Sequence, residues 1–257
     1  MSSIVTTGLQ GMPDLMPGDD LTALLIETLA VQGEKLRAGD VLVVAQKAVS
    51  KVEDRYVTLA SVTPSDEAKK LADIVQKDPR LVELVLQESQ GVVRSVPGVL
   101  IVRHRSGHVM ANAGIDASNL PVNSSERVLL LPKDSDASAC ELAAQISGRT
   151  GVNVAVVVSD SFGRPWRQGV TNVAIGVAGV AALYDKRDEE DFYGRTLLVT
   201  QVAVGDLLAA TAGLVMGEGS EGVPAALIRG VPTSYLQPEQ HNTSAALLRS
   251  AQDDLFR

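Results

Sequence analysis

The sequence has a single cysteine, few aromatic residues and no long hydrophobic run. Cys140 has no partner for an internal disulfide, and its neighbourhood predicts a helix with a buried, unreactive thiol. Aromatic residues make up only 3% of the chain, and no apolar stretch approaches the length of a transmembrane helix. The N-terminus lacks the basic region and apolar core of a signal peptide. These absences predict a cytoplasmic protein with no membrane partner.

Positive charge is also in short supply. Lys and Arg number 23 against 31 Asp and Glu, for a net charge of −8. A nucleic-acid-binding protein normally presents a basic face, so we expect no nucleic-acid partner. The chain has no Walker A motif and no G-x-G-x-x-G after a strand. His104, His108 and His241 lack the spacing of a zinc site, and we expect the first two at the surface.

The order of apolar runs and turn signals predicts a mixed α/β fold. Strands and helices alternate irregularly, and Ser106-Gly107 marks a hairpin turn, which together favour mixed sheets with flanking helices over a regular parallel sheet. We predict one unit over residues 1–257, with a division into two subdomains left open, and a polar extension over 237–257. Strands are expected at 4–7, 41–44, 92–110, 128–131, 154–158, 197–204 and 225–229. Helices are expected after caps at Asp20, Thr63 and Asp206, and from Asp78, Asp136 and Ser244.

Three acidic residues stand beside small residues just beyond apolar segments. Asp160 follows the buried run 154–158, Asp116 lies in an irregular stretch after a hairpin, and Glu218 lies between two glycines. Mg²⁺ and Mn²⁺ take carboxylates together with water and phosphate oxygens, so these acids could share ions. The alternative is that the two aspartates are turn or cap residues and that Glu218 is a solvated loop acid.

Basic residues near these acids could bind anions. Arg164 and Arg167 follow Asp160 and could clamp a phosphate or carboxylate, or could be structural arginines paired with the excess of acids. Lys47 and Lys51 follow a strand and lie four residues apart, a spacing that also suits two surface lysines. The glycines of 216–223 could let backbone amides approach phosphates, or could form a plain turn.

Five segments of the sequence resemble the coenzyme F420-0 gamma-glutamyl ligase family, and the likeness extends to about Val231. Asn-Ala-Gly-Ile-Asp-Ala-Ser-Asn and Ser-Asp-Ser-Phe-Gly-Arg-Pro-Trp-Arg are the most specific of them. The matching segments are residues 42–51, 112–119, 159–167, 191–195 and 217–219. The chain departs from the family at Ala45-Gln46, where members commonly carry Ser or Thr, and at Glu53-Asp54-Arg55, where they favour Glu-Gly-Arg.

The resemblance implies a set of site residues. The divalent-metal ligands would be Asp116, Asp160, Ser161 and Glu218, and the residues in catalytic roles would be Arg164, Arg167 and Lys51. The nucleotide contacts would be Met12, Pro13, Asp14, Leu15, Gln46, Lys47, Lys51, Asn119, Met216, Gly217, Glu218, Gly219, Ser220, Glu221, Gly222 and Val223.

The resemblance also implies an activity and an assembly. It predicts a ligase that uses GTP to join L-glutamate to F420-0 or a close variant, as an intertwined homodimer. The expected cofactors are two Mg²⁺ or Mn²⁺ ions, with K⁺ as a further candidate. Two other functions stay open: a nucleotide-dependent amide ligase for a different acid, and a catalytically silent nucleotide-binding dimer.

Overall fold

The chain folds into two compact units in the computed structural model, which describes residues 3–117, 126–236, 243–250 and 252–254. Unit 1 comprises residues 1–14, 20–46 and 134–257, and unit 2 comprises residues 15–19 and 47–133. Each unit has a hydrophobic core of its own. No helix in the described part of the chain is both long enough and apolar enough to cross a membrane.

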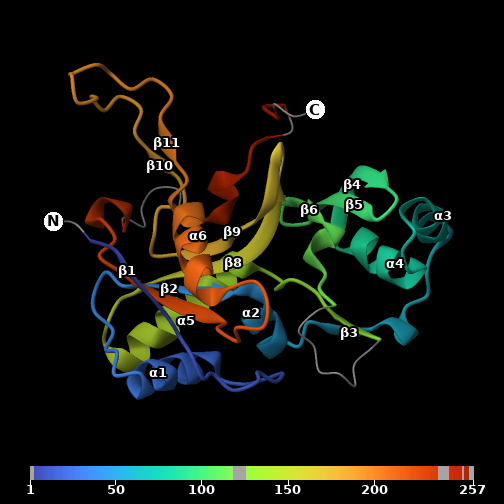
Figure 1. Ribbon diagram of the computed structural model, residues 1–257, viewed down its shortest axis with the longest axis horizontal. Helices are drawn as coiled ribbons and strands as arrows, with labels where there is room; N and C mark the ends of the chain where they lie inside the picture. The colour runs from blue at the N-terminus through green and yellow to red at the C-terminus, as the bar shows by residue number, and fades with distance from the viewer. Residues whose placement is uncertain (1–2, 118–125, 237–242, 251, 255–257) are drawn as a thin grey trace. The chain divides into compact units, whose positions relative to one another are not determined.

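A five-stranded sheet forms the centre of unit 1, in the order β1-β12-β2-β8-β9 (Figure 1). Only β2 and β8 pair in parallel, and all other neighbours are antiparallel. The prediction of a mixed sheet is therefore confirmed. The strands are β1 (Val5–Gly8), β2 (Val41–Ala45), β8 (Ala155–Arg164), β9 (Arg167–Ala178) and β12 (Ala225–Arg229).

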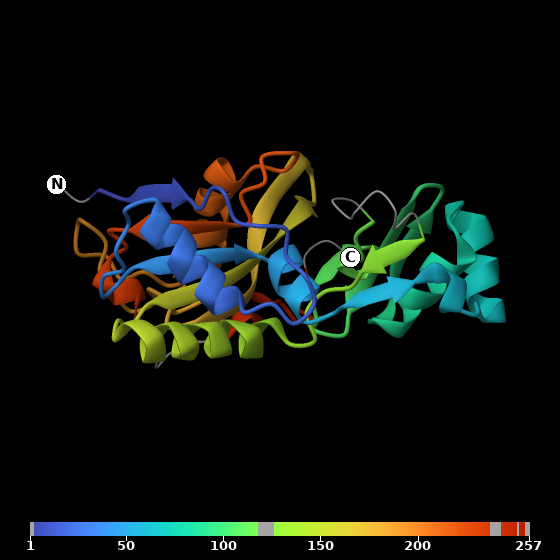
Figure 2. The same ribbon diagram turned by 90° about the horizontal axis from the view of Figure 1, so that it is seen from below.

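Helices cover both faces of this sheet. Figures 1 and 2 show α6 on one side, and α5 with α1 beside it on the other. Val41 and Val43 pack into the core on the α6 side, and the alternating residues Leu42 and Val44 are also fully buried. Burial on both faces explains why β2 and β8 contain uninterrupted apolar runs. The helices are α1 (Leu21–Val31), α5 (Ser135–Thr150) and α6 (Val204–Met216).

Unit 2 packs two helices against one face of a three-stranded sheet, β4-β5-β6. The predicted start of α4 is confirmed, because Asp78 accepts a hydrogen bond from a first-turn amide. The N-cap of α3 is Ser65 and not Thr63, so this helix begins two residues later than predicted. Its elements are α2 (Gln46–Val52), β3 (Tyr56–Thr58), α3 (Asp66–Val75), α4 (Pro79–Gln87), β4 (Ser89–Val96), β5 (Val99–His104), β6 (Val109–Ala111) and β7 (Arg127–Leu129). Short 3₁₀ turns lie at Leu59–Ser61 and Asn112–Gly114 in this unit, and at Thr233–Tyr235 and Ser244–Leu247 in unit 1.

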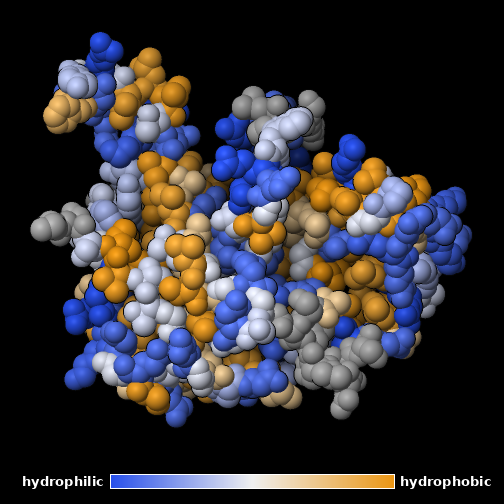
Figure 3. Space-filling view, viewed as in Figure 1, coloured by the Kyte–Doolittle hydropathy of each residue, from blue (hydrophilic) through white to orange (hydrophobic). Residues whose placement is uncertain are grey.

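A long arm connects β10 (Tyr184–Asp185) to β11 (Gln201–Val202) and extends away from the sheet of unit 1 (Figure 1). The predicted strand over 197–204 is therefore mostly wrong, because only Gln201–Val202 pairs as β11 and Val204 already begins α6. Four large apolar or aromatic side chains of the arm are 76–95% exposed: Phe192, Tyr193, Leu198 and Val199. Apolar atoms are visible on this arm in the space-filling view (Figure 3).

Several local predictions need correction. Cys140 is exposed on α5, because it faces away from the buried side of Ala139 and Leu142. Asp136 and Asp206 lie in the first turns of α5 and α6 and are not N-caps, positions taken by Asp134 and Ala203. Asp136 instead accepts hydrogen bonds from the amides of Val177 and Ser244, and so joins three segments of unit 1.

Candidate functional site

The β8–β9 hairpin carries the first group of predicted site residues. The sequence predicts that a strand ends before Asp160, but β8 continues through Asp160 and Ser161 to Arg164. The chain reverses at Pro165-Trp166, where Trp166 has a φ of +59° and is 89% exposed. Arg164 and Arg167 are therefore paired residues at the tip of a long hairpin, not members of a short loop beside Asp160.

Ser161 and Glu218 lie side by side, although 57 residues separate them in the chain. The Ser161 Oγ donates to Glu218 Oε2 at 2.5 Å. Asn172, which faces Ser161 across the hairpin, donates from Nδ2 to Glu218 Oε1, also at 2.5 Å. Both carboxylate oxygens are thus held by neutral donors, and no ion pair to Glu218 is found among the described residues.

Asp160 occupies the other side of the same strand. Successive side chains of a strand point to opposite faces, so Asp160 and Ser161 diverge from β8. A single ion held by both residues would need the main-chain carbonyl of Ser161 in place of its hydroxyl. Otherwise, each side chain would serve a different ion.

The glycine-rich loop after α6 has a defined conformation. Gly217 ends the helix with a φ of +73°, and a Cβ there would lie 2.3 Å from the carboxyl carbon of Glu221. The Glu221 carboxylate accepts a hydrogen bond from the Gly219 amide at 2.8 Å. One backbone amide of the predicted phosphate loop is therefore engaged by the carboxylate of the loop itself, which a phosphate would have to displace.

The third predicted acid, Asp116, lies in unit 2 and forms an ion pair with Lys47, with Nζ and Oδ2 2.6 Å apart. Asp116 is fixed by two backbone hydrogen bonds with Leu129, and Lys47 lies on α2 directly after β2. The Lys47 side chain is 33% exposed, so this ion pair is partly open to solvent. Lys51 lies one turn further along α2 and is half-buried.

The remaining predicted residues lie in several segments. Met12, Pro13 and Asp14 follow β1, and the buried Leu15 belongs to unit 2. Gln46 is 3% exposed at the start of α2. Arg164 donates to the Gln168 carbonyl at 3.3 Å. Asn119 lies outside the described residues.

The donor chemistry of Ser161 and Glu218 suits a hard divalent cation. A carboxylate offers about four lone-pair positions, and the two hydrogen bonds occupy one on each oxygen, which leaves the others for a metal. A group of three acidic, histidine or cysteine ligands is not found among the described residues. A cation here would therefore be completed by water, backbone oxygen or phosphate, as Mg²⁺ sites usually are.

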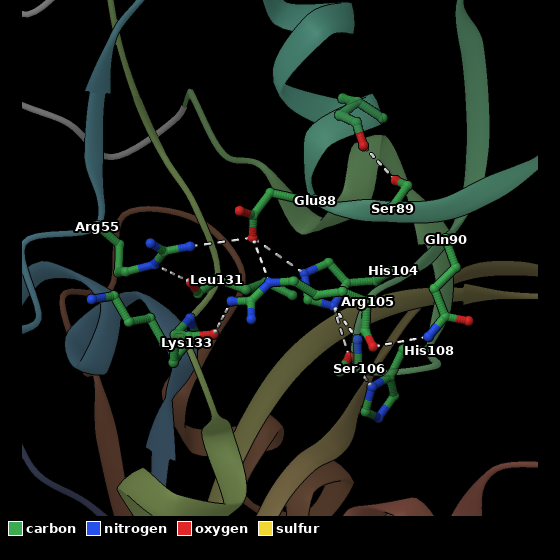
Figure 4. A network of polar contacts seen from close by, with 12 residues as sticks. Arg55, Glu88, Ser89, Gln90, His104, Arg105, Ser106, His108, Leu131 and Lys133 are labelled. Carbon is green, nitrogen blue, oxygen red and sulfur yellow. Dashed lines mark hydrogen bonds and ion pairs between the residues drawn. The ribbon is translucent and has the colours of Figure 1, made fainter.

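Unit 2 contains a second polar cluster, around Glu88 (Figure 4). Glu88 Oε2 accepts from Arg105 Nε at 3.0 Å and from Arg55 Nη2 at 3.2 Å. His104 Nε2 lies 3.6 Å away, too far for a hydrogen bond but close enough for an electrostatic contact. Burial alone would raise the pKa of Glu88, but His104, Arg105 and Arg55 outweigh it and lower the pKa to about 2.

The surface position predicted for His104 and His108 is wrong. These histidines are 2% and 5% exposed. Ser106 between them contacts the Nδ1 atom of each through its Oγ, at 2.7 and 2.9 Å. His104 Nδ1 accepts the Ser106 amide, so its ring proton lies on Nε2, toward Glu88. The turn at Ser106-Gly107 folds both imidazoles back into the unit, a contact that no spacing in the sequence reveals.

Comparison with known proteins identifies the family of the chain. The sequence profile described as F420-0:Gamma-glutamyl ligase matches residues 11–230. The chain belongs to the F420-0:gamma-glutamyl ligase family. The coenzyme F420:L-glutamate ligase of Methanopyrus kandleri is 42% identical over 260 residues, which cover 100% of both chains. Ligases of the same name from Methanothermobacter thermautotrophicus and Natronomonas pharaonis are each 43% identical, and cover 97% of this chain and 97% and 93% of their own.

The family segments occupy distinct places in this gamma-glutamyl ligase family member. Residues 159–167 form the β8–β9 hairpin, and residues 217–219 follow α6. Residues 191–195 form the tip of the arm, where Asp191 accepts hydrogen bonds from the amides of Tyr193 and Arg195. Asn172 was missed by sequence reasoning. Its signal was a lone amide side chain within a stretch of small and apolar residues.

Proposed function

We propose that this protein is a GTP- and divalent-metal-dependent ligase that joins L-glutamate to F420-0 through an acyl phosphate. The observation that carries the proposal is the full-length similarity to proteins named coenzyme F420:L-glutamate ligase. The hydrogen-bonded pair of Ser161 and Glu218 supports the proposal, because oxygen atoms of this kind bind divalent cations.

The reaction needs activation because a carboxylate does not release its oxygen. A carboxylate oxygen of F420-0 would attack the γ-phosphorus of GTP, and the bond from that phosphorus to the bridging oxygen of GDP would break. The glutamate amine would then attack the acyl carbon, lose a proton and expel inorganic phosphate. The products are an amide, GDP and phosphate, and every atom is accounted for.

The residues of this chain would act by positioning and by charge. Every reactant carries negative charge, and so does the protein as a whole. Lys47, Lys51, Arg164 and Arg167 would offset this charge locally, as cationic groups do in phosphoryl transfer generally. Bound Mg²⁺ or Mn²⁺, with K⁺ as a further candidate, would stabilise charge on the phosphate oxygens.

A reconstituted assay tests this function. Protein, GTP, Mn²⁺, glutamate and F420-0 are combined, and the product is measured by mass. We expect one glutamate residue or more to be added, with phosphate release that depends on both glutamate and F420-0. Release with another acid in place of F420-0 would favour the alternative amide ligase, and binding of GTP without release would favour a silent nucleotide-binding module.

Base selectivity is a separate part of the proposal. It rests on the family and not on any base contact in the structure. Titration of GTP and ATP in the presence of Mn²⁺ is expected to give tighter binding of GTP. Equal or tighter binding of ATP contradicts it.

We further propose a homodimer, supported by the exposed arm. The small-residue stretch 173–183 packs within unit 1, where Gly176 allows the backbone of Ser135 to approach. The arm instead presents Phe192 and Tyr193, which are 95% and 85% exposed. A double substitution of both by Ser is expected to give a monomer in light scattering, whereas a wild-type monomer with full activity contradicts the dimer.

A further inference from the structure

Asn172 lies where two strands and one helix end meet. It faces Ser161 across the hairpin, so their side chains leave the same face of adjacent strands, roughly 5 Å apart at Cβ. From these positions they reach the two oxygens of one carboxylate, that of Glu218. Asn172 itself is only 8% exposed, whereas Glu218 is exposed.

Helix α6 provides room for this amide. A Cβ at Gly213 would lie 2.6 Å from Nδ2 of Asn172 and 3.0 Å from its Cγ. Glycine inside a helix costs about 1 kcal/mol relative to alanine. The helix therefore carries a destabilising residue at the one position that would otherwise push Asn172 away from Glu218.

We propose that Asn172 is a positioning residue that orients the Glu218 carboxylate toward a bound divalent cation. This inference rests on the proposed metal role of Glu218. The amide is neutral, so it fixes the carboxylate without cancelling its charge. It also occupies one lone pair of Oε1 and directs the remaining ones. Hydrogen bonds to ligating carboxylates typically contribute 10- to 100-fold to metal affinity.

The test measures Mn²⁺ affinity of the full chain by calorimetry, in the absence of nucleotide. Asn172→Leu keeps a similar volume and removes the donor, and we expect a 10- to 100-fold weaker Mn²⁺ affinity with a nearly unchanged melting temperature. The matched control is Asn153→Leu, an exposed asparagine bonded only to Ser147, which should bind Mn²⁺ like the wild type. Wild-type affinity in Asn172→Leu would overturn the inference.

Two further variants strengthen the test, and the first keeps it decisive should Asn172→Leu misfold. Gly213→Ala retains the amide but displaces it, and should weaken Mn²⁺ binding although alanine favours the helix. In a Glu218→Gln background, Asn172→Leu should cause no additional loss, whereas fully additive losses would overturn the role. If the wild type binds no Mn²⁺, the proposed metal site fails as well. If the wild type, Asn172→Leu and Gly213→Ala all bind Mn²⁺ equally well, only the role of Asn172 is refuted.

Discussion

Two glutamates show how this protein treats negative charge in its two units. Glu88 in unit 2 is surrounded by two arginines and an imidazole, while Glu218 in unit 1 is held by a serine and an asparagine. The two arginines neutralise the charge of Glu88 within the fold. Neutral donors hold the Glu218 carboxylate without neutralising its charge, so the charge stays available to a bound cation. For these two glutamates, the charge of the partners separates the structural acid from the proposed ligand, whereas hydrogen bonding alone does not.

The largest expected effect comes from removing Asp160, an expected metal ligand on the strand that also carries Ser161. Asp160→Ala should reduce ligation about 1000-fold, because loss of a metal ligand costs several kcal/mol of transition-state stabilisation. The melting temperature should stay close to that of the wild type. Asp253→Ala, an exposed aspartate bonded to Ser250, is the control and should leave turnover unchanged. Activity of Asp160→Ala within a few-fold of the wild type would remove Asp160 from the site.

Exchanging the two glutamates for glutamine should separate stability from function. Glu88→Gln leaves Arg55 and Arg105 without their counter-ion and should lower the free energy of unfolding by about 3 kcal/mol, with Mn²⁺ affinity intact. Glu218→Gln should do the reverse. Thermal melting and Mn²⁺ titration of both variants test this. If both variants lose stability, or both lose Mn²⁺ affinity, the contrast between Glu88 and Glu218 is contradicted.

Acid should weaken unit 2 through the same carboxylate. The pKa of Glu88 falls from 4.5 to about 2 on folding. A lowered pKa stabilises the folded state above pH 4.5, and this stability is lost as the pH falls from 4.5 toward 2. The shift corresponds to about 3 kcal/mol. The difference in unfolding free energy between wild type and Glu88→Gln should shrink across that window, and a constant difference would contradict the assignment.

The hairpin tip should show a smaller effect. Arg164→Lys and Arg167→Lys retain charge but lose the planar fork that fits phosphate or carboxylate, so we expect roughly 10-fold lower turnover at saturating GTP in at least one variant. The glutamate-dependent rate measures this. If both rates equal that of the wild type, the arginines have no anion-binding role.

The smallest effect concerns the turn before Arg55. Asp54 has a φ of +52°, a conformation that glycine adopts freely, and the family favours glycine there. Asp54→Gly should therefore raise the unfolding free energy by up to about 1 kcal/mol. Chemical denaturation checks this, and a loss of stability would mean that the aspartate side chain holds the turn.

The sequence predicted what depends on neighbouring residues. Asp78 was identified as a helix start because capping is a local interaction, and β12 was placed correctly from its apolar run. Predictions failed where the local structure or the burial of a residue depends on a segment far away in the chain. β8 runs on through Asp160 because β9 pairs with it, and His104 is buried because Glu88 and Ser106 surround it. Asn172 escaped notice because its role depends on Gly213 and Glu218, which lie far along the chain.

The position of β12 between β1 and β2 has a consequence for synthesis. Residues 5–8 and 41–45 leave the ribosome early but find their shared neighbour only when residues 225–229 follow. Most of unit 2 is one continuous segment and can fold before then. We therefore expect nascent unit 1 to remain open, with a bare strand edge, until residues 225–229 have emerged. Such edges promote aggregation, so slow elongation before these residues emerge should be hazardous for its production.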